Sequence, residues 1–123
     1  MTTRKSHKQR GARWEVELTE EFRELGYDSE RLARRGSKDE GDIVVRKGIF
    51  GKHLIVEAKA PGESGRINLS GWAKEAQIEA QNYSEARSLK DGQVLPSVII
   101  KARGKSVKDS YVVFRFGDIF SGE

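Results

Sequence analysis

Two acidic residues and one lysine in the first half of the chain have the types and spacing of a metal-dependent hydrolytic site. Residues 54–60 read LIVEAKA, so Glu57 and Lys59 interrupt an apolar run that is typical of a buried β-strand. Because side chains alternate between the two faces of a strand, these two charges share one face. Asp42 opens the preceding β-rich run. A hairpin turn within residues 46–52 is expected to bring its carboxylate to the same sheet end as Glu57.

Two carboxylates beside an ammonium are suited to holding Mg²⁺ for phosphodiester hydrolysis. Mg²⁺ is usually bound by one or two carboxylates together with waters and substrate phosphate. The ion polarises the phosphate and lowers the pKa of a bound water, while an ammonium orients that water and stabilises negative charge. A surface salt bridge between Glu57 and Lys59, worth about 0 to 1 kcal/mol, is the competing interpretation. The apolar context favours a bound ion or ligand, since uncompensated charge in a partly buried strand is costly.

The rest of the chain must position these residues, and its pattern predicts one α/β domain with a mixed central sheet flanked by helices. The 123 residues suffice for one modest core. Periodicity predicts the order helix, three strands, helix, two strands, and the second helix is a crossover long enough for parallel pairing of its flanking strands. The helices are expected at residues 12–25 and 72–89, with Ser70 as a cap, and the strands near Leu32 and at 42–45, 53–60, 95–101 and 111–116.

The excess positive charge lies in residues 1–10, which are expected to form a flexible basic arm ahead of a single domain over residues 11–123. The arm holds four basic residues and no acidic one, and the net charge of the whole chain is +4. Such an arm is attracted to nucleic acid, although a solubilising tail is an alternative. The chain has no cysteine and no stretch long enough for a membrane helix, so we expect a soluble protein of the reducing cytoplasm.

Four sequence elements, in the expected order, resemble the archaeal-type Holliday junction resolvases of the PD-(D/E)XK nuclease superfamily. They are the helical segment KQRGARWEVEL at residues 8–18, Arg35-Gly36-Ser37, Gly41-Asp42-Ile43-Val44 and Ile55-Val56-Glu57-Ala58-Lys59. The resemblance implies a restriction-endonuclease-like core and a Mg²⁺-dependent endonuclease, with Mn²⁺ able to substitute. It also implies a homodimer that resolves branched, four-way DNA by paired symmetric nicks. A viral or phage member, acting in the host cytoplasm, is an open alternative.

The resemblance also implies roles for individual residues. Glu15 maps to the helix glutamate that completes the metal site of Asp42 and Glu57, Lys59 to the catalytic lysine, and Ser37 to a loop serine near the scissile phosphate. Taken alone, Glu15 is explained as well by the preference of acidic residues for the first turn of a helix.

The chain departs from the family pattern at two positions. Val16 stands where an arginine usually follows the helix glutamate, so Arg13 is a candidate for the missing phosphate contact. Gly41 stands in place of the motif proline, and the loop before it is one residue longer than the pattern. The sequence alone therefore does not define the geometry of that loop.

Phosphate contacts, which position a protein on DNA without reading sequence, are expected from the arm, the loop before Asp42 and one polar face of the second helix. The candidates are Lys5, Lys8, Arg10, Arg13, Arg34, Arg35, Lys38, Gln77 and Gln81. For the two glutamines a solvated helix face is the alternative.

Two other functions are open. One is a different PD-(D/E)XK nuclease for repair, restriction or phage DNA processing, and the other is a non-catalytic DNA-binding module. The presence of all of Glu15, Asp42, Glu57 and Lys59 favours an enzyme, since binding to phosphates alone needs no acidic cluster.

Overall fold

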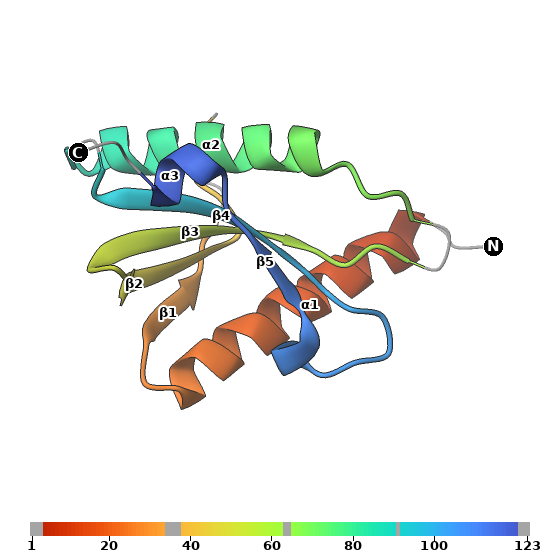
Figure 1. The fold of residues 1–123 in the computed structure, drawn as a ribbon. Coiled ribbons are helices and arrows are strands. Elements are labelled where there is room, and N and C mark those ends of the chain that lie inside the picture. The colour runs from red at the N-terminus through yellow and green to blue at the C-terminus, as the bar shows by residue number, and fades with distance from the viewer. Residues whose placement is uncertain (1–3, 34–37, 63–64, 91, 121–123) are drawn as a thin grey trace.

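The computed structural model describes residues 4–33, 38–62, 65–90 and 92–120. A five-stranded sheet with the strand order β1-β2-β3-β4-β5 lies between helix α1 on one face and helix α2 on the other (Figure 1). The elements are α1 (Arg4–Glu24), β1 (Asp28–Arg31), β2 (Ile43–Ile49), β3 (Lys52–Lys59), α2 (Leu69–Ala86), β4 (Val94–Ile100), the 3₁₀ turn η1 (Val107–Asp109), β5 (Tyr111–Val113) and α3 (Phe116–Ile119). The predicted α/β class with a mixed sheet is confirmed.

The pairing of the strands follows from their connections. β2 and β3 form an antiparallel hairpin in which Ile43 lies opposite Val56. β3 and β4, which α2 connects, pair in parallel from His53 opposite Val94 to Lys59 opposite Ile100, as the length of the crossover predicts. β1 and β5 add antiparallel edges to this core. The hairpin thus brings the start of β2 to the end of β3, where the charged residues lie.

Each face of the sheet has its own core. On the α1 face, Trp14 and Leu18 are buried against Val56 and Ile99, and the indole N–H of Trp14 donates to the carbonyl of Ile99 at 3.2 Å. On the other face, the small residue Ala80 lets α2 pack closely on β2 and β3. Strand alternation therefore directs odd-numbered side chains of β3, including the two charged ones, towards α2.

The N-terminal segment differs from the prediction, because α1 begins at Arg4 rather than near Ala12. Residues 4–10, expected as a flexible arm, are thus helical. Lysine, arginine and glutamine are good helix formers, and Gly11, at a cost of about 1 kcal/mol, is the least favourable position before Trp14. A Cβ added at Gly11 would meet no atom within 4 Å, so no close contact requires a glycine at this position. The side chains of Lys5 and Lys8 lie outside the part that the structure describes.

Several element boundaries also differ from the prediction. β1 lies at Asp28–Arg31, ahead of the expected position near Leu32. α2 begins at Leu69 and is capped by Asn68 rather than Ser70, because the Asn68 carboxamide oxygen accepts from the backbone N–H of Gly71 at 3.1 Å. The short helix α3 follows β5 and was not predicted. No helix among the described residues is long and apolar enough to span a membrane.

Candidate active site

Asp42 and Glu57 meet at the open end of the β2–β3 hairpin. The backbone N–H of Asp42 donates to the carbonyl of Val56 at 3.1 Å, which continues the strand pairing by one residue. The Asp42 carboxyl oxygen Oδ2 accepts from the backbone N–H of Ala58 at 2.8 Å, and the charge of the neighbouring Glu57 acts on the same carboxyl group. The structure therefore brings together the two carboxyl groups that the hairpin was predicted to join.

Lys59 extends from the next position of the same strand face and binds carboxylates on two elements. Its Nζ lies 3.4 Å from Glu57 Oε1 and 3.6 Å from Glu75 Oε2, and 5.5 Å from the centre of the Trp72 ring. Burial acts to lower the pKa of Lys59, but the charges of Glu57 and Glu75 outweigh burial and raise it above its usual value. The ammonium thus stays charged in the neutral pH range.

Glu15 approaches the same region from α1. Its Oε1 accepts from Arg31 Nη2 at 3.3 Å and Arg31 Nε at 3.4 Å. Burial raises the pKa of Glu15 despite the opposing effect of Arg31, and repulsion from Glu57 adds to the increase. Glu15 is therefore an electrostatic neighbour of the hairpin carboxylates, held by a partly exposed guanidinium.

Two glutamates of α2 complete the cluster, and neither was predicted from the sequence. Glu79 is only 4% exposed, and its Oε2 has no hydrogen-bond partner among the residues that the structure describes. Burial, followed by contact with Glu57, raises the pKa of Glu79 to about 10. A detectable signal existed, because Glu79 falls at helical spacing within the buried stripe of Ala76, Ala80 and Tyr83, where a charge is unexpected.

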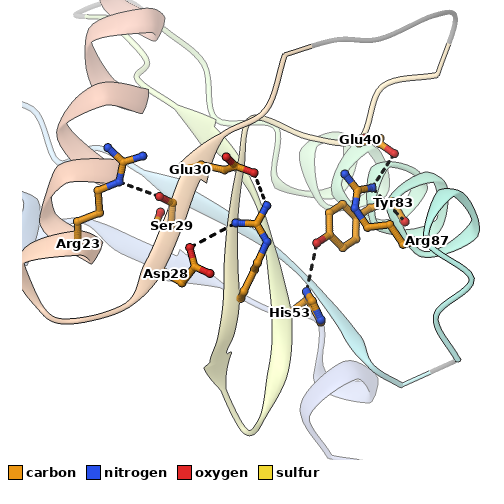
Figure 2. A network of polar contacts seen from close by, with 9 residues as sticks. Arg23, Asp28, Ser29, Glu30, Glu40, His53, Tyr83 and Arg87 are labelled. Atoms are coloured by element: carbon orange, nitrogen blue, oxygen red, sulfur yellow. Dashed lines mark hydrogen bonds and ion pairs between the residues drawn. The ribbon is translucent and has the colours of Figure 1, made fainter.

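The loop before Asp42 is fixed to the C-terminal half of α2. Asn82 Nδ2 donates to the carbonyl of Asp39 at 2.8 Å, and Arg87 Nη1 lies 2.9 Å from Glu40 Oε2. Figure 2 shows the second of these contacts within a network of polar side chains. These contacts set the position of Asp42 relative to α2, and thus to Glu79.

Gly41 explains why the motif proline is absent. Its φ is +103°, a region that proline cannot adopt because its ring fixes φ near −65°. A Cβ at this position would also lie 2.8 Å from the Ile55 side chain and 3.3 Å from Glu79 Oε2. The glycine leaves room for the buried carboxyl group of Glu79 next to Asp42.

The electrostatics of the site favour a hard divalent cation. Burial, reinforced by the charge of Glu57, raises the pKa of Asp42 to about 8. Five carboxyl groups, those of Glu15, Asp42, Glu57, Glu75 and Glu79, gather at this end of the hairpin, where Lys59 pairs with Glu57 and Glu75 and Arg31 pairs with Glu15. An all-oxygen donor set with excess negative charge is the kind of site that Mg²⁺ and related ions prefer. The residues therefore fit a divalent metal ion.

Comparison with solved structures finds a likeness to Hjc of Archaeoglobus fulgidus, described as a Holliday junction resolvase from an archaeal hyperthermophile. The two folds are similar. The TM-score is 0.53 at 18% sequence identity, and the match covers 80% of this chain and 74% of the other. At this identity the likeness concerns the fold, a mixed five-stranded sheet with flanking helices. No protein-family model and no curated protein matches the chain.

The structure describes some of the residues that were predicted to contact DNA and not others. Arg10 Nε donates to the carbonyl of Ala60 at 3.1 Å, and Arg13 is exposed. Gln77 Oε1 accepts from Arg115 at 2.8 Å, whereas Gln81 and Lys38 both contact the exposed Glu85. The two glutamines thus pair outside the carboxylate cluster, and Glu75 and Glu79 take the positions of α2 that reach it. Arg34, Arg35 and Ser37 lie outside the described residues.

Proposed function

We propose that this chain is a Mg²⁺-dependent DNA endonuclease that resolves four-way junctions by paired symmetric nicks. The observation that carries the proposal is the group Asp42, Glu57 and Lys59 at one end of a β-hairpin, where a charged ammonium lies 3.4 Å from Glu57 Oε1 and the carboxyl groups of Asp42 and Glu57 are electrostatic neighbours. The fold similarity to a junction resolvase supports the same reading. A binding module would gain nothing from carboxylates that repel phosphate.

Asp42 and Glu57, with Glu15 from α1, would hold Mg²⁺, for which Mn²⁺ would substitute. When bound, the ion supplies Lewis acidity at the phosphodiester and lowers the pKa of a coordinated water. Lys59 donates to the attacking water or to a phosphate oxygen, and its positive charge offsets the charge that develops in the transition state. Ser37 would contact the scissile phosphate from the loop before Asp42.

Junction resolution needs two such sites, because two strands must be cut and we assign one site to each chain. We therefore propose a homodimer that binds branched DNA in the cytoplasm, that of the host if the source is viral. The phosphate contacts would come from the N-terminal half of α1, the loop before Asp42 and the exposed side of α2. The proposed residues are Lys5, Lys8, Arg10, Arg13, Arg34, Arg35, Lys38, Gln77 and Gln81. These contacts fix the orientation of the DNA while leaving its sequence unread.

The nuclease is tested by incubating the purified chain with a labelled four-way junction in Mg²⁺ or in EDTA. Asp42→Asn is expected to abolish nicking while junction binding persists, because it removes a metal ligand without removing a basic residue. Asp28→Asn, at an exposed carboxylate 3.4 Å from Arg46 in the surface network of Figure 2, is the matched control and should cut like the wild type. Cutting that survives both EDTA and Asp42→Asn would overturn the proposal.

A further inference from the structure

We propose that Glu75 and Glu79 of α2, together with Glu57, form a second divalent-cation site beside the one assigned to Asp42 and Glu57. One carboxylate oxygen from each of the three glutamates lies within 4.8 Å of the other two. Oxygen ligands of a single divalent ion lie at most about 4 to 5 Å apart, since each is about 2.1 to 2.5 Å from the ion. The three side chains are thus already spaced to share one ion.

The state of Glu79 is an independent indication of a ligand. Its side chain is buried, it lies between Glu57 and Gly41, and within the described part of the chain its Oε2 accepts no hydrogen bond. Buried polar atoms are nearly always paired in native proteins, so an unpaired carboxylate oxygen calls for an explanation. A bound cation provides it, because the ion takes the lone pair that no protein donor reaches.

Lys59 shows that this position already attracts positive charge. Its ammonium lies 3.4 Å from Glu57 Oε1 and 3.6 Å from Glu75 Oε2, so it bridges two of the three proposed ligands. The side chain of Glu75 is 51% exposed, which gives the ion an entry path and leaves room for water ligands. A divalent ion would therefore compete with Lys59 for Glu57 and Glu75 and release the ammonium towards solvent and substrate.

The second site shares Glu57 with the first, and this part of the inference rests on the proposed function. The carboxyl group of Glu57 is an electrostatic neighbour of both Asp42 and Glu79. Two ions that share a carboxylate neutralise a substrate phosphate from both sides, which is a recurring arrangement in phosphodiester hydrolysis. The chemical class of the ligand is a small, oxygen-preferring divalent cation.

Calorimetric titration of the full chain with Mn²⁺ tests the inference without any measurement of cleavage. The wild type is expected to bind two ions per chain, and Glu79→Gln and Asp42→Asn one ion each. Glu75→Gln, at a half-exposed position that tolerates the change, should weaken one of the two binding events by about tenfold or more. Glu85→Gln, exposed on the same helix but outside the cluster, is the control and should still bind two.

A single ion per wild-type chain would overturn the second site, as would titrations of Glu75→Gln and Glu79→Gln that match the wild type. Thermal melting of each variant shows whether the loss of an ion is caused by unfolding of the variant. If Glu79→Gln proves unstable, the titration of Glu75→Gln still tests the second site. The two proposals fail differently. A chain that binds two Mn²⁺ but never nicks DNA would contradict the nuclease alone, whereas a nuclease that binds one ion would contradict the second site alone.

Discussion

Asp42→Asn is expected to stabilise the metal-free protein at the same time as it removes nuclease activity. The Asp42 carboxyl group is largely buried beside Glu57. Its pKa is raised to about 8, because burial leaves its charged form poorly solvated and the negative charge of Glu57 repels it. An asparagine keeps the acceptor for the Ala58 N–H and offers Glu57 an N–H donor instead of a second negative charge. The substitution removes repulsion without removing a hydrogen bond.

The size of the effect follows from linkage between proton binding and folding. The pKa of Asp42 rises from about 3.8 in the unfolded chain to about 8 in the folded one, so the folded state binds more protons between these values and stability falls as the pH rises through them. At about 1.4 kcal/mol for each pKa unit, the upper limit is roughly 6 kcal/mol above pH 8. Partial solvation of the site reduces the expected gain to about 1 to 3 kcal/mol.

Urea or thermal unfolding in EDTA at pH 5 and pH 8 measures this gain. Asp42→Asn should melt about 5 to 15 °C above the wild type at pH 8, with a smaller difference at pH 5. Asp28→Asn, with its side chain 70% exposed, should show no such pH dependence. Added Mg²⁺ should narrow the difference, because binding to the folded wild type restores its stability. An Asp42→Asn protein that is less stable than the wild type at pH 8 would refute the reasoning.

Three further substitutions test the site and its scaffold. Lys59→Met should lower the nicking rate in single-turnover cleavage by about 10²-fold or more. The affinity for the junction, measured by gel shift, should change little. An unchanged nicking rate would show that Lys59 takes no part in the mechanism. Gly41→Ala should lower the free energy of unfolding by about 1 to 3 kcal/mol in urea titrations, because φ is +103° and the new Cβ would lie 2.8 Å from the Ile55 side chain. A variant as stable as the wild type would contradict the need for glycine at this position. Trp14→Phe should lower the free energy of unfolding by about 1 to 3 kcal/mol in the same titrations, because the hydrogen bond to the Ile99 carbonyl is lost. Unchanged stability would contradict a stabilising role for this hydrogen bond.

The sequence predicted the sheet and the meeting of Asp42 with Glu57 because both depend on local signals. Alternation placed Glu57 and Lys59 on one face, and the short connection between the β-rich runs required a hairpin. The crossover helix then implied the parallel pair β3–β4, which the structure confirms. Each step relied on residues that are near one another in sequence.

Glu75 and Glu79 escaped prediction because their role depends on how α2 lies over the sheet. The polar positions Gln77 and Gln81 were preferred as site residues, yet they belong to the exposed side of the helix. The rotation of α2 is set by burial of Ala76, Ala80 and Tyr83, which directs Glu79 inward. Contacts such as that of Asn82 with the Asp39 carbonyl, 43 residues apart, then fix the loop before Asp42 and have no signature in the sequence.

The central claim is most directly tested by offering the purified chain a labelled four-way junction and a linear duplex of the same sequence, each with Mg²⁺. We predict nicks at symmetry-related positions on two opposing strands of the junction and little cutting of the linear duplex. Equal cutting of both substrates would contradict junction resolution and favour another nuclease of the same superfamily. Binding of the junction without any nick in Mg²⁺ or Mn²⁺ would contradict the enzyme itself.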